Sequence, residues 1–203
     1  MFKLVIVDLM GILTSNENEY SLLKKIINYK GTAQSLKAYL GDSYDRLLLG
    51  EIPQSSFWNK LVKKNQTKKK LETIKKEFFK SFKPIFNPKL LEEARQNFSF
   101  ALCSNFYYPW YLLIKKANNI EFDYESISSK SKIKKNNKEM YLSAMLKFDL
   151  TPSECLVVSD EINDLSLAKE LGMKAMLIPG KSKEFKGADY SYEKFDDFLK
   201  ILI

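Results

Sequence analysis

Histidine is absent from the 203 residues. That absence excludes catalysis by a Ser-His-Asp triad or a Cys-His pair, and it excludes zinc held by imidazole rings. Cysteine is scarce: Cys103 and Cys155 both lie inside apolar runs, so we expect no disulfide framework and a reducing, cytoplasmic location. No apolar run is long enough to span a bilayer, and the amino-terminal residues do not have the pattern of a signal peptide. We therefore expect no membrane partner.

Arginine is also scarce. Lysine and arginine together number 33 against 25 acidic residues, which gives a formal charge of +8, but Arg46 and Arg95 are the only arginines. Proteins that read bases or phosphates of nucleic acids usually use the bidentate arginine side chain. We therefore expect a small phosphorylated molecule, which a basic surface also attracts, rather than a nucleic acid. The protein is expected to be a monomer or a homodimer.

The first apolar run, residues 2–7, is rich in valine and isoleucine and ends at Asp8. A run of this length and composition indicates a strand buried on both faces of a parallel sheet. Asp8 would then lie at the carboxyl end of the strand, where such sheets bind ligands, and Gly11 would let the backbone turn away. The alternative is a buried strand whose final Asp only caps the next segment.

Residues 15–85 show helical spacing of apolar side chains and no strand-like alternation. The segment predicts a bundle of four or five short helices, inserted after the first strand. Four of its aromatic side chains would either pack inside the bundle or line a substrate pocket: Tyr20, Tyr44, Phe57 and Trp58.

From residue 86 onwards, predicted strands alternate with predicted helices. The strands are expected at residues 98–103, 121–124, 155–158 and 174–178. The helices are expected at residues 88–96, 110–117, 138–148 and 163–171, and from about residue 193. This alternation predicts an α/β fold, a Rossmann-like parallel sheet with helices on both faces. Residues 1–14 and 86–203 would form this core, and residues 15–85 a helical cap.

Polar side chains follow three of the predicted strands. Because the carboxyl ends of parallel strands share one edge, we expect these residues to meet there: Asp8, Ser104, Asn105, Asp160 and Asp164. The three carboxylates suit Mg²⁺, and the Ser and Asn side chains offer donors to an anion. Lys135, or a neighbour in its loop, would neutralise the carboxylates. Taken singly, Asp164 is more typical of a helix surface and Ser104 of a helix N-cap; their joint occurrence in this order favours a site.

These residues carry a resemblance to the haloacid dehalogenase-like (HAD) superfamily of hydrolases, most of which are Mg²⁺-dependent phosphohydrolases. Four stretches resemble its motifs in order: residues 8–13, 102–105, 135–141 and 157–164. Residues 49–58 resemble the helical cap of the subgroup that holds small sugar-phosphate phosphatases and haloacid dehalogenases.

The resemblance implies a role for each matching residue. Asp8 would be the nucleophile that forms an aspartyl phosphate, and Ser104, Asn105 and Lys135 would bind the substrate, with Ser104 and Lys135 also serving catalysis. Mg²⁺ would be held by four groups: Asp8, the backbone carbonyl of Met10, Asp160 and Asp164. The third motif lacks its two usual prolines, which leaves Lys134 or Lys132 as alternatives to Lys135.

Met10 is the main departure from the family pattern. The family's phosphatases have a second Asp there, which protonates the leaving group and later activates water; methionine cannot transfer a proton. Three hypotheses follow. The first is a phosphohydrolase that is slow or takes its acid from the cap, from Glu17, Glu19 or a tyrosine. The second is a 2-haloacid dehalogenase-type hydrolase with Arg46 as carboxylate clamp, and the third is a catalytically impaired HAD-fold binding protein.

Overall fold

The computed structural model describes residues 1–15 and 18–203. Within them lies one parallel sheet with the strand order β3-β2-β1-β4-β5-β6. The strands are β1 (Leu4–Val7), β2 (Ser99–Ser104), β3 (Tyr124–Ile127), β4 (Cys155–Ser159), β5 (Lys174–Leu177) and β6 (Tyr190–Ser191). Val7 pairs with both Leu102 and Val158, so the three central strands reach the same edge of the sheet. The predicted α/β class is confirmed.

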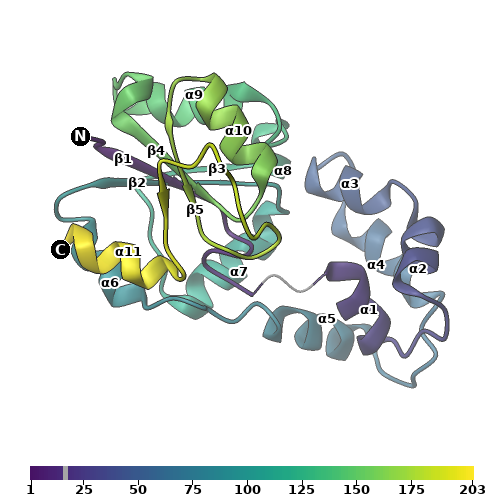
Figure 1. Ribbon diagram of the computed structural model, residues 1–203. Helices are drawn as coiled ribbons and strands as arrows, with labels where there is room; N and C mark the ends of the chain where they lie inside the picture. Colours follow the sequence, from purple (N-terminus) through teal and green to yellow (C-terminus); the bar gives the residue numbers. More distant parts are fainter. Residues whose placement is uncertain (16–17) are drawn as a thin grey trace.

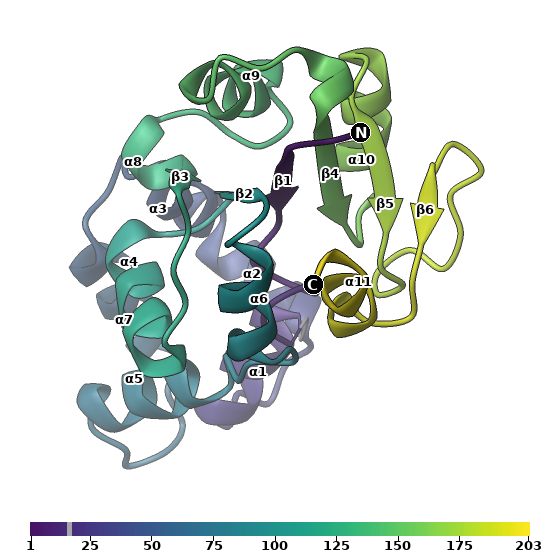
Figure 2. The same ribbon diagram turned by 90° about the vertical axis from the view of Figure 1, so that its left-hand side faces the viewer.

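Alternate side chains of the strands enter two separate apolar layers, as the period of a strand requires. Val5 and Val7 face one layer, and Leu4 and Ile6 face the other. The first layer is covered by α6 (Pro88–Ala94), α7 (Tyr108–Asn118) and α11 (Phe195–Leu202). The second is covered by α9 (Lys138–Lys147) and α10 (Ile162–Glu170), with a 3-10 turn at Pro152–Glu154 before β4. Figure 2 shows the helices on both sides of the sheet.

Of the six described helices between β1 and β2 in the sequence, five lie beyond one end of the sheet (Figure 1). They are α1 (Glu19–Ile26), α2 (Ala33–Leu40), α3 (Ser43–Leu48), α4 (Gln54–Val62) and α5 (Leu71–Lys80). Each is short and buries one apolar stripe, which agrees with the helical spacing of the sequence. We propose to treat residues 15–85 as a cap and the remainder as the core.

Aromatic packing joins the cap to the core. The ring of Trp110, on α7, lies 5.3 Å from the rings of both Trp58 and Phe78 in the cap, measured between centroids. The indole Nε1 of Trp110 donates to Gln54 Oε1 at 3.0 Å. One apolar cluster therefore runs from the first layer of the sheet into the helical bundle.

A second contact between cap and core lies at α8 (Ser128–Ser131), a single helical turn after β3. This turn was not predicted from the sequence. Ser128 Oγ donates to the carbonyl of Leu48 at 2.6 Å, and Lys132 Nζ donates to the carbonyl of Gly50 at 2.6 Å. The core thus satisfies backbone carbonyls at the end of α3, which a helix end otherwise leaves without partners.

Two other features differ from the prediction. The two-residue strand β6 was not predicted, and β3 begins at Tyr124 rather than at residue 121. Ile120 and Phe122 are buried at alternate positions. This alternation is the pattern that predicts a strand, although the strand begins only after them. No helix within the described ranges has the length and apolar character needed to cross a membrane.

Candidate active site

Asp8 lies directly after β1 and is 5% exposed. Its Oδ1 accepts hydrogen bonds from the backbone N–H of Leu9 at 2.7 Å and from Ser104 Oγ at 3.0 Å. Its Oδ2 accepts from Lys135 Nζ. The carboxylate is therefore held in one orientation by a residue from each of two other segments.

Lys135, and neither Lys134 nor Lys132, is the lysine that reaches the strand ends. Its Nζ contacts Asp8 and lies 2.7 Å from Asp164 Oδ2. Lys134 lies 4.0 Å from Asp45 in the cap, and Lys132 binds the carbonyls at the end of α3. Burial acts to lower the pKa of Lys135, but the charges of Asp8 and Asp164 outweigh it and the pKa is raised.

Asn105 has a partner that the sequence analysis did not anticipate. Its Oδ1 accepts from the backbone N–H of Lys135 at 2.7 Å, so it anchors the loop that carries the lysine. The third motif lacks its prolines, and Asn137 instead begins α9 by accepting from Glu139 N at 3.0 Å. A direct contact of Asn105 with substrate stays a prediction.

Asp160 is buried in a cradle formed by two glycines. A Cβ atom on Gly180 would come within 2.5 Å of Asp160 Oδ2. A Cβ atom on Gly11, where φ is +83°, would come at least as close to the same oxygen. The backbone N–H of Lys181 donates to Oδ2 at 3.0 Å. Burial raises the pKa of Asp160, and this hydrogen bond offsets the shift only in part.

Three carboxylates share one point of the strand edge. One oxygen from each of Asp8, Asp160 and Glu161 lies within 4.8 Å of the other two. This donor set consists of hard oxygen ligands, and Gly11 and Gly180 leave the room that the Asp160 carboxylate occupies. The set fits a divalent cation such as Mg²⁺.

Asp164 lies outside the cluster of Asp8, Asp160 and Glu161, and its role as a metal ligand stays a prediction. Its Oδ2 accepts from Ser159 Oγ at 2.6 Å and pairs with Lys135. Burial raises the pKa of its carboxyl more than Lys135 lowers it. Asp164 is 4% exposed, which rules out the alternative that it is a surface residue of a helix. Here it positions the lysine.

Met10 lies beside these groups and is 8% exposed. Its sulfur accepts a hydrogen bond from Thr14 Oγ1 at 3.4 Å. The backbone turns sharply there, because Gly11 N–H donates to Thr14 O and Leu13 N–H to Leu9 O. The sulfur carries no exchangeable proton, so the position supplies no acid. The role of the Met10 carbonyl as a ligand stays a prediction.

The cap aromatics pack against one another. Tyr44 lies 5.7 Å from Tyr20 and 5.5 Å from Phe57, and Phe57 lies 5.3 Å from Trp58, between ring centroids. These contacts favour core packing over pocket lining for this group. Arg46 pairs with Glu51 at 3.3 Å on the cap surface, and Glu17 lies outside the described residues.

Glu161 and Lys181 also lie at the candidate site, although no sequence pattern singled them out. Glu161 lies inside the fourth motif but was assigned no role, and Lys181 follows β5, whose carboxyl end reaches the same edge. Their side chains form an ion pair. Burial acts to raise the pKa of Glu161, but the bond from Lys181 lowers it overall. Ligands bind at the carboxyl ends of parallel strands, and inspection of the residues after β5 on this basis would have found Lys181.

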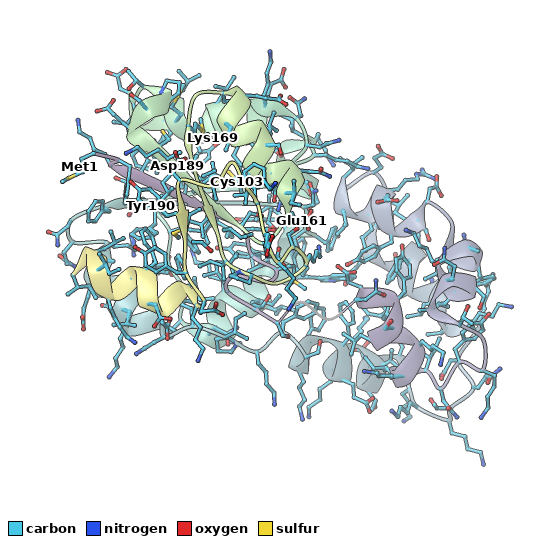
Figure 3. All side chains as sticks on the ribbon, in the orientation of Figure 1. Met1, Cys103, Glu161, Lys169, Asp189 and Tyr190 are labelled. Atoms are coloured by element: carbon cyan, nitrogen blue, oxygen red, sulfur yellow. The ribbon has the colours of Figure 1, made fainter. Side chains whose placement is uncertain are left out.

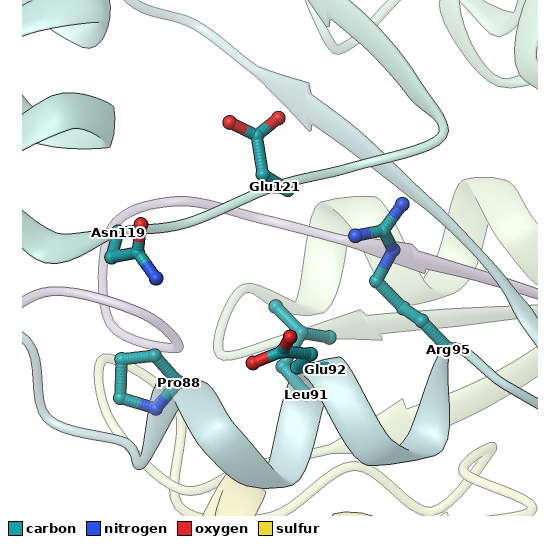
Figure 4. Close-up of a pocket in the computed structure, with 6 residues that line it drawn as sticks. All are labelled: Pro88, Leu91, Glu92, Arg95, Asn119 and Glu121. Carbon is teal, nitrogen blue, oxygen red and sulfur yellow. The ribbon is translucent and has the colours of Figure 1, made fainter.

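A pocket of about 250 Å³ lies elsewhere, beside the start of β2 (Figure 4). Its lining residues are Pro88, Leu91, Glu92, Arg95, Asn119 and Glu121. Arg95 pairs with Asp123, which accepts from the backbone N–H of Phe100 near the start of the strand. The pocket is therefore at the amino end of the sheet and is separate from the carboxylates.

Comparison with known proteins gives matches over nearly the whole chain. A family model described as haloacid dehalogenase-like hydrolase matches residues 2–172. A Bacillus subtilis (strain 168) protein named "Putative phosphatase YhcW" is 25% identical over 192 residues, which cover 89% of this chain and 85% of that protein.

Two solved structures share the fold. A HAD family enzyme from Bacteroides thetaiotaomicron, in complex with magnesium and inorganic phosphate, has a TM-score of 0.68 and 19% identity, covering 92% of this chain and 98% of its own. The L-2-haloacid dehalogenase from Xanthobacter autotrophicus, with chloropropionic acid covalently bound, has a TM-score of 0.67 and 15% identity, covering 100% and 98%.

Proposed function

The chain belongs to the haloacid dehalogenase-like hydrolase family, and from this premise we propose that it is a Mg²⁺-dependent phosphohydrolase acting on a small phosphorylated molecule. The observation that carries the proposal is the meeting of Asp8, Asp160 and Glu161 within 4.8 Å, beside the buried ammonium group of Lys135. Phosphoryl transfer depends mainly on positioning and on stabilising charge, and this arrangement offers both.

In the proposed reaction, Asp8 attacks the phosphorus atom, the bond from phosphorus to the leaving oxygen breaks, and an aspartyl phosphate forms. Ser104, 3.0 Å from Asp8, donates to a phosphoryl oxygen, and Lys135 stabilises the charge of the transferring group. Water then attacks phosphorus, which releases phosphate and restores the Asp8 carboxylate. Asp164 and Asn105 keep Lys135 in place.

Mg²⁺, held by Asp8, Asp160 and the Met10 carbonyl, would supply a Lewis acid that offsets the negative charge of the phosphoryl oxygens. The residues here fit it because the oxygens are hard ligands in one small space. Asp164 assists indirectly through Lys135.

Because of Met10, we expect slow hydrolysis of phosphate esters. Because the methionine side chain cannot give a proton, the leaving oxygen must take one from solvent, and release of the aspartyl phosphate lacks a base. We expect substrates with good leaving groups, such as aryl phosphates and acetyl phosphate, to react faster than alkyl phosphates.

The test is hydrolysis of p-nitrophenyl phosphate with Mg²⁺. Turnover should be measurable in the wild type, abolished by EDTA and abolished by Asp8→Asn. Met10→Asp should raise turnover by roughly tenfold or more, since general acid–base catalysis contributes about 10²–10⁴-fold. Absence of turnover with aryl and acetyl phosphates would favour the phosphate-binding, non-catalytic alternative.

A second candidate function is 2-haloacid dehalogenation. It is favoured by the fold shared with the Xanthobacter enzyme and by Met10, because halide displacement needs no leaving-group acid. Arg46, the predicted carboxylate clamp, is instead paired with Glu51. Chloride release from 2-chloropropionate in EDTA would support this function, and none is expected.

A further inference from the structure

Glu161 and Lys181 lie at the strand edge, next to the carboxylates of the candidate metal site. Glu161 begins α10 as its N-cap residue, yet its side chain makes no capping hydrogen bond. It is turned instead toward Lys181, with which it forms an ion pair. In Figure 3 Glu161 lies at the end of the core nearer to the cap helices, opposite Met1.

The same Glu161 carboxylate has a second set of neighbours. One of its oxygens lies within 4.8 Å of oxygens from Asp8 and Asp160. A helix N-cap carboxylate that faces two other carboxylates is repelled by them, and Lys181 relieves the repulsion. The Glu161 side chain is therefore within reach of both an ammonium group and the place where a cation would bind.

Lys181 is fixed to the site through its backbone, independently of its side chain. Its N–H donates to Asp160 Oδ2 at 3.0 Å, and Ser182 N–H donates to Asp160 O at 3.0 Å. The Lys181 side chain is half exposed. It can change partner without moving the loop that holds Asp160.

Formal charges point in the same direction. Four carboxylates gather here, on Asp8, Asp160, Glu161 and Asp164, against the two ammonium groups of Lys135 and Lys181. A divalent cation would balance the remaining two negative charges. Such a cation would stabilise the Glu161 carboxylate, and the Lys181 ammonium group would then be available to an incoming anion.

We propose that Glu161 and Lys181 form a metal-responsive pair: Glu161 leaves Lys181 to become an additional carboxylate ligand of the bound divalent cation, and the released Lys181 binds the phosphoryl group of the substrate. This rests on the proposed function for the identity of the anion. It adds two residues to the site, one for the cation and one for the substrate.

The first experiment titrates Mg²⁺ alone into the protein by isothermal calorimetry, without substrate. Glu161→Gln should weaken Mg²⁺ binding by about tenfold or more, because a carboxylate ligand is lost. Lys181→Met should tighten it by about threefold, because the competing ion pair and a nearby positive charge are removed. In the double variant the effect of Lys181→Met should shrink, since Glu161 is no longer there to be released.

Two control variants separate local from general charge effects. Glu170→Gln, at the other end of α10, matches the charge change of Glu161→Gln. Lys169→Met removes an ion pair with Asp189 on the surface and matches Lys181→Met. Both controls should change the Mg²⁺ dissociation constant by less than about twofold.

The second experiment titrates inorganic phosphate at saturating Mg²⁺. Lys181→Met should weaken phosphate binding by about tenfold, the opposite direction to its effect on Mg²⁺. Mg²⁺ affinities of both site variants within twofold of wild type would overturn the proposal and leave the phosphohydrolase proposal standing. Weaker Mg²⁺ binding by Glu161→Gln, with no hydrolysis by the wild type, would uphold the pair and overturn the proposed function.

Discussion

The core and the cap stabilise themselves in different ways. In the core, the strand ends bury four charged side chains, on Asp8, Lys135, Asp160 and Asp164, each at most 5% exposed. Among the described residues of the cap no charged side chain is buried, and its ion pair between Lys69 and Glu77 is more than a third exposed on both sides. The cap is held together by apolar and aromatic packing.

This difference separates stability from function. Burying charge costs several kcal/mol per ion unless partners compensate, and apolar residues of similar volume are often as stable or more so. The core carries that cost at one edge only, where the strands end. The described residues of the cap carry no such cost, because none of their charged side chains is buried.

The largest expected effect comes from removing the central cation of the core. Lys135→Met leaves Asp8 and Asp164 buried without their shared partner, and it should lower the free energy of unfolding by about 3–5 kcal/mol. Urea denaturation in EDTA measures this. Lys134→Met removes the neighbouring exposed lysine and should change stability by less than about 0.5 kcal/mol. Equal effects of the two substitutions would mean that the buried charges are not coupled.

A smaller effect is expected where the cap meets the core. Gly50 has φ +63°, and a Cβ atom there would lie 2.5 Å from the carbonyl oxygen of Ser129. Gly50→Ala should therefore destabilise by about 2 kcal/mol or more, because backbone strain and displacement of α8 add together. Thermal unfolding checks the value.

Gly172, at the end of α10, is the matched control. It also has a positive φ, +78°, but the nearest atom to an added Cβ would be 3.6 Å away. Gly172→Ala should cost only the strain, about 1 kcal/mol. If both substitutions lower the free energy of unfolding equally, close contact between position 50 and Ser129 does not contribute to the effect.

The smallest expected effect is a pH dependence confined to the core. Burial acts to raise the pKa of Asp123, but hydrogen bonds from Arg95 and from the Phe100 N–H lower it overall. The folded pKa is below the unfolded one, so this stabilisation is present above the unfolded pKa of about 4 and is lost as pH falls through the folded pKa.

Asp123→Asn should remove that part of the acid sensitivity and lower stability at neutral pH by roughly 1 kcal/mol. Unfolding measured from neutral to acid pH tests this. Asp45→Asn is the cap counterpart: Asp45 is 59% exposed and its lysine lies 4.0 Å away, so we expect the acid profile to stay unchanged. A change as large as that of Asp123→Asn would contradict the comparison.

Much of the fold could be predicted because the spacing of apolar residues follows the side of each helix or strand that is buried. Strands β1, β2, β4 and β5 lie where apolar spacing placed them, within a few residues, and the described part of residues 15–85 forms five short helices, as its helical spacing predicted. The segment before β3 shows the limit, since Ile120 and Phe122 alternate like strand residues but precede the strand. The single-turn α8 and the two-residue β6 are too short to leave a period in the sequence.

The sequence by itself determined the order of the motifs, the helical character of residues 15–85 in their described part, and the residue types that gather where the strands end. Only the tertiary structure decided the partners: that Lys135 rather than Lys134 or Lys132 reaches Asp8, that Asp164 holds this lysine, and that Glu161 joins Asp8 and Asp160. The physical reason is that a local pattern fixes which side of an element is buried. Which charges meet depends on contacts between segments more than a hundred residues apart, as between Asp8 and Lys135.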